Sequence, residues 1–62
     1  MNYAELKKKL KAGGCYKLDE GKRHERWYSP KTGETFYVGR HNGQEVASGT
    51  LSSIKKASGL DL

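Results

Sequence analysis

The stretch KRHERWYSPKTGETFYVGR, residues 22–40, decides how this chain folds. Its two ends, KRHERWYS and ETFYVGR, are rich in the aromatic and β-branched residues that favour strands. The segment between them, SPKTGET, places Pro30 and Gly33 at positions that tight turns favour. A connection this short joins antiparallel neighbours. The stretch therefore predicts two adjacent antiparallel strands.

A third strand is predicted directly upstream, in CYKLDE, residues 15–20. Its alternation would put Tyr16 and Leu18 on the inner face and Lys17 on the outer face. Gly21 marks the turn that follows this strand. We therefore expect all three strands to form one antiparallel meander, since each connection is short.

The segment NYAELKKKLKAGG, residues 2–14, predicts a helix before the strands. Asn2 can cap it, and Glu5 can complete a capping box three residues later. Tyr3, Leu6 and Leu10 have the spacing of one apolar stripe. The lysines that fill the rest of this helix are interpreted as a solvated face rather than a phosphate track.

A second helix is predicted in SGTLSSIKKASGL, residues 48–60. Ser48 is the expected cap, and Gly59 ends the helix, with Leu60 closing over its end as in a Schellman motif. The expected inner face of this helix consists of Leu51, Ile54 and Ala57.

These elements predict one α+β domain over residues 1–62, in the order α-β-β-β-α. Each element has a single apolar face, so both helices should cover the same face of the three-stranded antiparallel sheet. The other face of the sheet should remain uncovered.

The middle strand cannot bury both Trp27 and Tyr28, because neighbouring side chains point to opposite faces. Trp27 has the larger apolar surface and is placed on the helix side. Arg23 and Glu25 share its face, near an edge where their charges can reach water. The uncovered face is then expected to carry Lys17, His24, Arg26, Tyr28 and Tyr37.

The charge balance favours a negatively charged partner. Twelve lysines and arginines against seven acidic residues give a formal net charge of +5, which suits nucleic acid or an acidic protein. The single cysteine, Cys15, cannot form an internal disulfide. No apolar run of signal or membrane length is present, so we expect a cytoplasmic protein with no membrane partner.

The residues on the uncovered face suit cleavage of an RNA backbone. Without a metal, this reaction needs a base for the 2′-hydroxyl proton, an acid for the leaving oxygen, and cations for the phosphate. Histidine can perform either proton transfer near neutral pH. His24 is the candidate, with Lys22, Arg23 and Arg26 as phosphate contacts. A strand histidine without a catalytic role remains the alternative on these residues alone.

His41 lies beside Arg40 in GRHNG, which predicts a mobile, exposed loop. His41 is interpreted as a contact to phosphate or to a partner, with a second acid or base role left open. The two histidines and Cys15 have no metal-ligand spacing, so neither a metal site nor another cofactor is expected.

The chain resembles the HicA toxins, small ribonucleases of toxin–antitoxin pairs. Three motifs carry the resemblance, in this order: GKRH at residues 21–24, VGRH at residues 38–41 and SGTLSSI at residues 48–54. The ending KKASGL also fits the family. Two departures are visible: Lys22 and Arg23 stand where many members have Ser-His, and Gly39 replaces a usual proline, which should loosen the loop to His41.

The resemblance implies a fold like that of double-stranded-RNA-binding domains. It also implies metal-independent cleavage of mRNA, with His24 as the essential histidine, and a HicB-type antitoxin that binds and neutralises the toxin. In this interpretation Arg40 joins the phosphate contacts, while Tyr28 and Tyr37 are candidate surfaces for base stacking. The enzyme would block translation.

Two other classes of function remain open from the sequence. A non-catalytic RNA-binding module could share the fold, but a duplex binder needs cations where the second helix starts, and Ser48, Gly49 and Thr50 occupy that place. A purely structural interaction protein would leave His24 dispensable.

Overall fold

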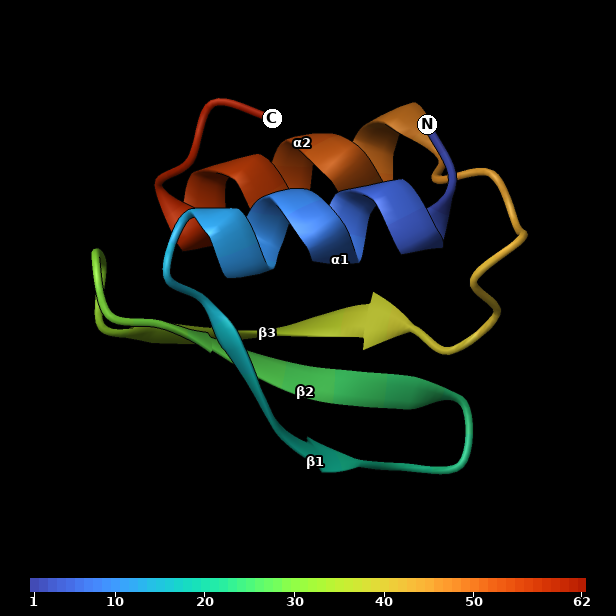
Figure 1. The fold of residues 1–62 in the computed structure, drawn as a ribbon, viewed down its shortest axis with the longest axis horizontal. Coiled ribbons are helices and arrows are strands. Elements are labelled where there is room, and N and C mark those ends of the chain that lie inside the picture. The colour runs from blue at the N-terminus through green and yellow to red at the C-terminus, as the bar shows by residue number, and fades with distance from the viewer.

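The structure, a computed structural model, describes residues 1–62 and has the predicted order of elements. The three strands form one antiparallel sheet in the order β1-β2-β3. Both helices lie on one side of this sheet, and the other side is uncovered (Figure 1). The α+β prediction is therefore confirmed. The elements are α1 (Tyr3–Ala12), β1 (Tyr16–Glu20), β2 (His24–Ser29), β3 (Glu34–Gly39) and α2 (Ser48–Ser58).

The core lies between the sheet and the helices and is centred on Trp27, which is 1% exposed. Phe36 and Val38 of β3 are buried beside it, as predicted from their alternation. The burial of Trp27 confirms the orientation chosen for β2. The buried apolar cluster consists of Leu6, Leu10, Cys15, Trp27, Phe36, Val38, Val46 and Ile54.

Helix α1 begins with the predicted capping box. The Asn2 side chain accepts a hydrogen bond from the Glu5 N–H at 2.9 Å, and the Asn2 N–H donates to the Glu5 carboxylate at 3.4 Å. Leu6 and Leu10 point into the core. Tyr3 packs against Gly39 so closely that an added Cβ would lie 2.9 Å from its ring. Close packing of the Tyr3 ring thus requires glycine at the end of β3.

Helix α2 ends at Gly59 as predicted, but the Leu60 N–H forms no Schellman bond to a helix carbonyl, and the start of the helix also differs. Gly59 closes it with a φ of 71°, a left-handed conformation that favours glycine. Its N-cap is Ala47 without a side-chain hydrogen bond, and Ser48 is already helical, so the predicted Ser48 cap is wrong. The Leu60 N–H bonds to the Ser58 hydroxyl at 3.3 Å. Ile54 is buried as predicted, and two half-buried residues pack around the core beside it, Leu51 and Ala57.

Strand β1 contradicts the predicted alternation because it contains a bulge at Leu18. The register pairs Lys17 with Trp27 and then Asp19 with Arg26, so the faces are set by these pairs rather than by simple alternation. Lys17 consequently lies on the helix side. Two side chains predicted to be inside are exposed, Tyr16 by 49% and Leu18 by 43%.

Glu25 also differs from its prediction, because it is only 8% exposed and does not reach water at an edge. Strand β2 is the central strand, so its helix-side residues are covered. The Glu25 carboxylate accepts hydrogen bonds from Lys7 Nζ and from Trp27 Nε1, each at 3.0 Å. Lys7 Nζ also donates to Asn42 Oδ1 at 2.6 Å. The charge is thus buried together with its partners.

Replacing Glu25 with alanine should lower the free energy of unfolding by about 3–5 kcal/mol, because Lys7 would become an uncompensated, largely buried charge. The Trp27 N–H would also lose its acceptor. Urea unfolding followed by circular dichroism measures the change. Glu34→Ala, which removes an exposed carboxylate from β3, is the matched control and should stay within about 0.5 kcal/mol of the wild type. Equal, small effects in both variants would show that the Glu25 contacts contribute no stability.

Candidate functional site

His24 is the first residue of β2 and pairs with Gly39 of β3. Its side chain is exposed and forms no hydrogen bond within the chain. It lies on the uncovered face, since the register and the buried neighbours Glu25 and Trp27 fix the alternation of β2. Both ring nitrogens are therefore accessible to a substrate.

The turn before His24 presents two cations. The Gly21 N–H donates to the His24 carbonyl at 2.7 Å, which leaves Lys22 and Arg23 as the connecting residues. Arg23 thus precedes the strand rather than sharing the face of Trp27. Both side chains are exposed and neither forms an ion pair. We call residues 21–24 the histidine turn.

A row of three residues crosses the uncovered face beside His24. Arg26 stands between Asp19 of β1 and Tyr37 of β3 in the register. An Arg26 Nη lies 2.7 Å from an Asp19 carboxylate oxygen. Arginine has five N–H donors, so the remaining donors of Arg26 can still bind another group. Asp19 was not anticipated, although its place opposite Arg26 follows from counting back from the Gly21–His24 bond of the turn.

Three tyrosines lie on this face. Tyr37 is 66% exposed, and Tyr28 is half-buried. Tyr16, which pairs with Tyr28 in the register, places its ring centroid 5.5 Å away with the planes tilted by 53°. Tyr16 therefore extends the pair of aromatic residues that the sequence assigned to this surface.

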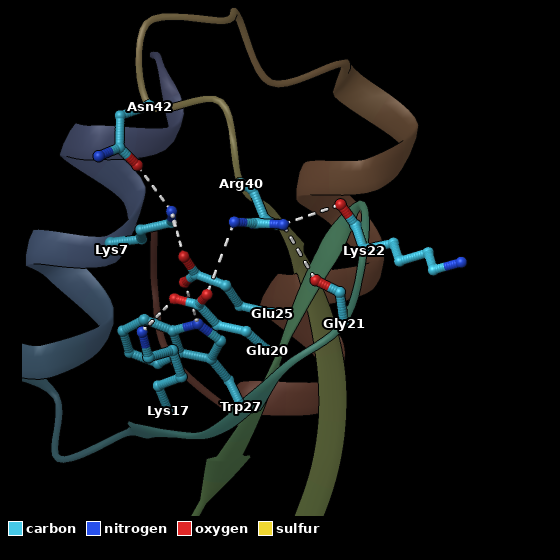
Figure 2. Close-up of polar contacts among 9 residues, drawn as sticks. All are labelled: Lys7, Lys17, Glu20, Gly21, Lys22, Glu25, Trp27, Arg40 and Asn42. Atoms are coloured by element: carbon cyan, nitrogen blue, oxygen red, sulfur yellow. Dashed lines mark hydrogen bonds and ion pairs between the residues drawn. The ribbon is translucent and has the colours of Figure 1, made fainter.

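A charged cluster lies on the helix side of the histidine turn (Figure 2). Glu20 and Glu25 are directly opposite each other in the β1–β2 register, and like charges in this position repel. Each carboxylate has its own lysine, with Lys7 3.0 Å from Glu25 and Lys17 2.8 Å from Glu20. We define the carboxylate cluster as Lys7, Lys17, Glu20, Glu25 and Arg40.

The positive charges around Glu20 shift its titration. A hydrogen bond from Lys17 lowers the pKa of Glu20 from its ordinary value of 4.5, and the charges of Lys17 and Arg40 lower it further. The same hydrogen bond raises the pKa of Lys17. Near neutral pH the Glu20 side chain, next to the histidine turn, is thus a carboxylate held between the cations of Lys17 and Arg40.

Arg40 connects this cluster to the histidine turn. One Nη lies 3.6 Å from a Glu20 carboxylate oxygen, and the other donates to the carbonyls of Gly21 at 3.2 Å and Lys22 at 2.9 Å (Figure 2). Its side chain remains 42% exposed. The guanidinium, predicted to contact phosphate, is thus already engaged within the chain.

His41 follows in a loop that is bound to the start of α1. The Tyr3 and Ala4 N–H groups donate to the carbonyls of Gln44 and Asn42, at 3.1 and 3.0 Å. These bonds satisfy N–H groups that a helix start leaves free. The backbone of the loop that was expected to be mobile is therefore hydrogen-bonded to the start of α1. The His41 side chain is exposed, and no hydrogen bond joins it to His24.

One other feature of the surface lies apart from this site. A shallow depression lies at the end of α2, next to Ser58. The Ser58 carbonyl accepts a hydrogen bond from the Ser29 hydroxyl, and Ser29 is at the end of β2 opposite to His24. No group of three or more histidine, cysteine, aspartate or glutamate side chains is arranged to hold a metal ion. Neither helix has the length and apolar character needed to cross a bilayer.

Comparison with known proteins identifies one family. The model of the HicA toxin of bacterial toxin–antitoxin systems matches residues 3–60, which is nearly the whole chain. Comparison with curated proteins and with solved structures gives no match. The matched region contains α1, all three strands, α2 and every residue of the histidine turn. This chain belongs to the HicA toxin family.

Proposed function

We propose that this toxin is a metal-independent endoribonuclease that blocks translation by cleaving mRNA, with His24 as the general acid or base. The observation that carries the proposal is the exposed His24 imidazole beside the cations of Lys22 and Arg23, on a sheet face that no helix covers. An imidazole and adjacent cations are the groups that this chemistry requires.

The proposed reaction is attack of the RNA 2′-hydroxyl on the adjacent phosphorus. The new bond is 2′-O–P, the bond that breaks is P–O5′, and the products carry a 2′,3′-cyclic phosphate and a 5′-hydroxyl. His24 removes the proton from the 2′-hydroxyl or donates one to the leaving 5′-oxygen. Water at this open site completes the other proton transfer. The cations stabilise the charge that develops on the phosphate oxygens.

The substrate is proposed to be single-stranded RNA lying across the uncovered face. Lys22 and Arg23 are unpaired cations and are the principal phosphate contacts, with Arg26 beside them. Tyr28 and Tyr37 offer rings for stacking, which contributes about 1–3 kcal/mol per base in single-strand binding. Tyr16 enlarges this surface through its contact with Tyr28. His41 is assigned a further phosphate contact.

His24→Ala should abolish RNA cleavage and growth arrest while the protein stays folded, because an exposed strand side chain contributes little packing. Purified wild-type protein and the variant are incubated with single-stranded RNA in EDTA, and the 2′,3′-cyclic phosphate ends are quantified. Lys8→Ala, an exposed position on α1, away from the sheet face, is the control and should cleave normally.

Full cleavage by a folded His24→Ala variant would remove His24 from the mechanism. Cleavage by the wild type that stops in EDTA and returns with Mg²⁺ would contradict metal independence. RNA binding by the wild type without any cleavage would instead identify a non-catalytic RNA-binding module.

The toxin–antitoxin context supports a second part of the proposal, a HicB-type antitoxin that covers the same face. Such a partner would bury Tyr28 and Tyr37 and place carboxylates near Arg23 and Arg26, whereas the Arg40 guanidinium lies on the helix side and is engaged within the chain. Opposite charges speed the encounter of the two proteins, and buried aromatic contacts hold the complex together. Inhibition would then be steric and competitive with RNA.

Titrating an acidic or acid-patched antitoxin should displace bound RNA, protect His24 from an imidazole-modifying reagent, and raise the melting temperature of the toxin by mass action. Mass spectrometry distinguishes modification of His24 from that of His41. If His24 keeps its reactivity when cleavage is fully inhibited, occlusion is wrong and the antitoxin acts at a distance.

A further inference from the structure

Arg40 is the only residue whose side chain bonds to the backbone of the histidine turn. One of its terminal nitrogens donates to two successive carbonyls, those of Gly21 and Lys22, and the other faces Glu20. Figure 2 shows the guanidinium held between the turn and the carboxylate, while the Lys22 side chain points away from it. Arg40 therefore holds the backbone of the turn rather than its side chains.

The turn has few other attachments. A single backbone hydrogen bond closes it, from the Gly21 N–H to the His24 carbonyl. Strand β1, which enters the turn, has no buried residue and interacts mainly with β2. Segments with few buried contacts open at low free-energy cost. Lys22 and Arg23 belong to no strand, unlike His24, which pairs with Gly39, so their arrangement depends on contacts made from outside the hairpin.

Arg40 itself is well anchored. It follows Gly39, which pairs with His24 across β2 and β3 and packs under the Tyr3 ring. On its other side Asn42 accepts from Lys7 through its side chain and from Ala4 through its carbonyl. The guanidinium therefore links a fixed part of the fold to the Gly21 and Lys22 backbone of the turn.

We propose that Arg40 is a positioning residue of the ribonuclease site, which rests on the proposed role of His24. It holds the backbone of the histidine turn so that the imidazole and the two adjacent cations keep one arrangement around a phosphate. Glu20, itself bound by Lys17, keeps the guanidinium in place. This role differs from the phosphate contact expected for Arg40 from the sequence.

The two roles predict different effects of Arg40→Lys. A lysine retains the positive charge and can contact a phosphate as a point charge. Its single ammonium on a shorter side chain cannot reach three oxygens on two sides, as the planar guanidinium does. A positioning role is therefore lost in Arg40→Lys as well as in Arg40→Ala, whereas a phosphate contact largely survives in Arg40→Lys.

The test compares wild type, Arg40→Lys and Arg40→Ala by ¹⁵N relaxation of the Lys22 and Arg23 amides, by kcat and KM on single-stranded RNA, and by the salt dependence of binding. Both variants should lower the order parameters of these amides and reduce kcat by about 10- to 100-fold, since misplacing a catalytic group by 1 Å can cost about 100-fold. KM and the melting temperature should stay close to the wild-type values.

Two further variants serve as references. Arg23→Ala should reduce the slope of log binding constant against log salt concentration by about 0.7, the value for one phosphate contact on a single strand. Lys8→Ala, which removes an exposed cation without an ion pair from α1, should leave kcat and the order parameters unchanged. Arg40→Lys and Arg40→Ala should both keep the wild-type slope of log binding constant against log salt concentration.

The inference is overturned if Arg40→Lys cleaves normally, Arg40→Ala loses about 0.7 of the salt slope, and the turn stays ordered in both. That result would make Arg40 a phosphate contact. If wild-type protein does not cleave RNA, the proposed function fails on that measurement alone. The order parameters then still decide whether Arg40 holds the turn, and unchanged values in both variants reject it.

Discussion

The buried carboxylate of Glu25 is the constraint on which the arrangement of this protein depends. It accepts from Lys7 on α1 and from the indole of Trp27 on its own strand, and Lys7 extends the connection to Asn42 in the loop after β3. A carboxylate in this position is tolerated only with such partners. Glu25 and Trp27 together therefore fix which face of β2 meets α1, and the alternation of the strand sends His24 to the opposite face.

Some cations near the site neutralise carboxylates, and others are left without an acidic partner. Lys7, Lys17 and Arg40 neutralise the carboxylates of Glu20 and Glu25, which face each other across two strands. Lys22 and Arg23, at the tip of the turn, have no acidic partner and lie next to His24. Lys22 and Arg23 thus place unpaired positive charge beside the only exposed strand imidazole, while the unpaired lysines of α1 lie on the other side of the sheet. This local field is the basis for assigning RNA to this face.

The sequence predicted the element order, the inward direction of Trp27 and the exposure of His24, because these follow from periodicity and residue size. It did not predict the face of Tyr16 and Lys17, since a bulge at Leu18 depends on pairing rather than on the local pattern. Counting back from the turn, where Gly21 bonds to His24, would have placed Asp19 opposite Arg26. The contacts of Glu25 and Arg40 were not accessible in this way, because their partners are distant in sequence or are backbone carbonyls.

The central claim is that the uncovered sheet face around His24 is the surface that binds RNA. NMR titration with a single-stranded RNA carrying 2′-O-methyl groups tests it most directly, because this RNA lacks the attacking hydroxyl and the complex persists. The account predicts shift changes at His24, Arg26, Tyr28 and Tyr37, and none on the exposed side of α1 at Lys8 and Lys11. Changes confined to the helices, with the sheet face unaffected, would contradict it.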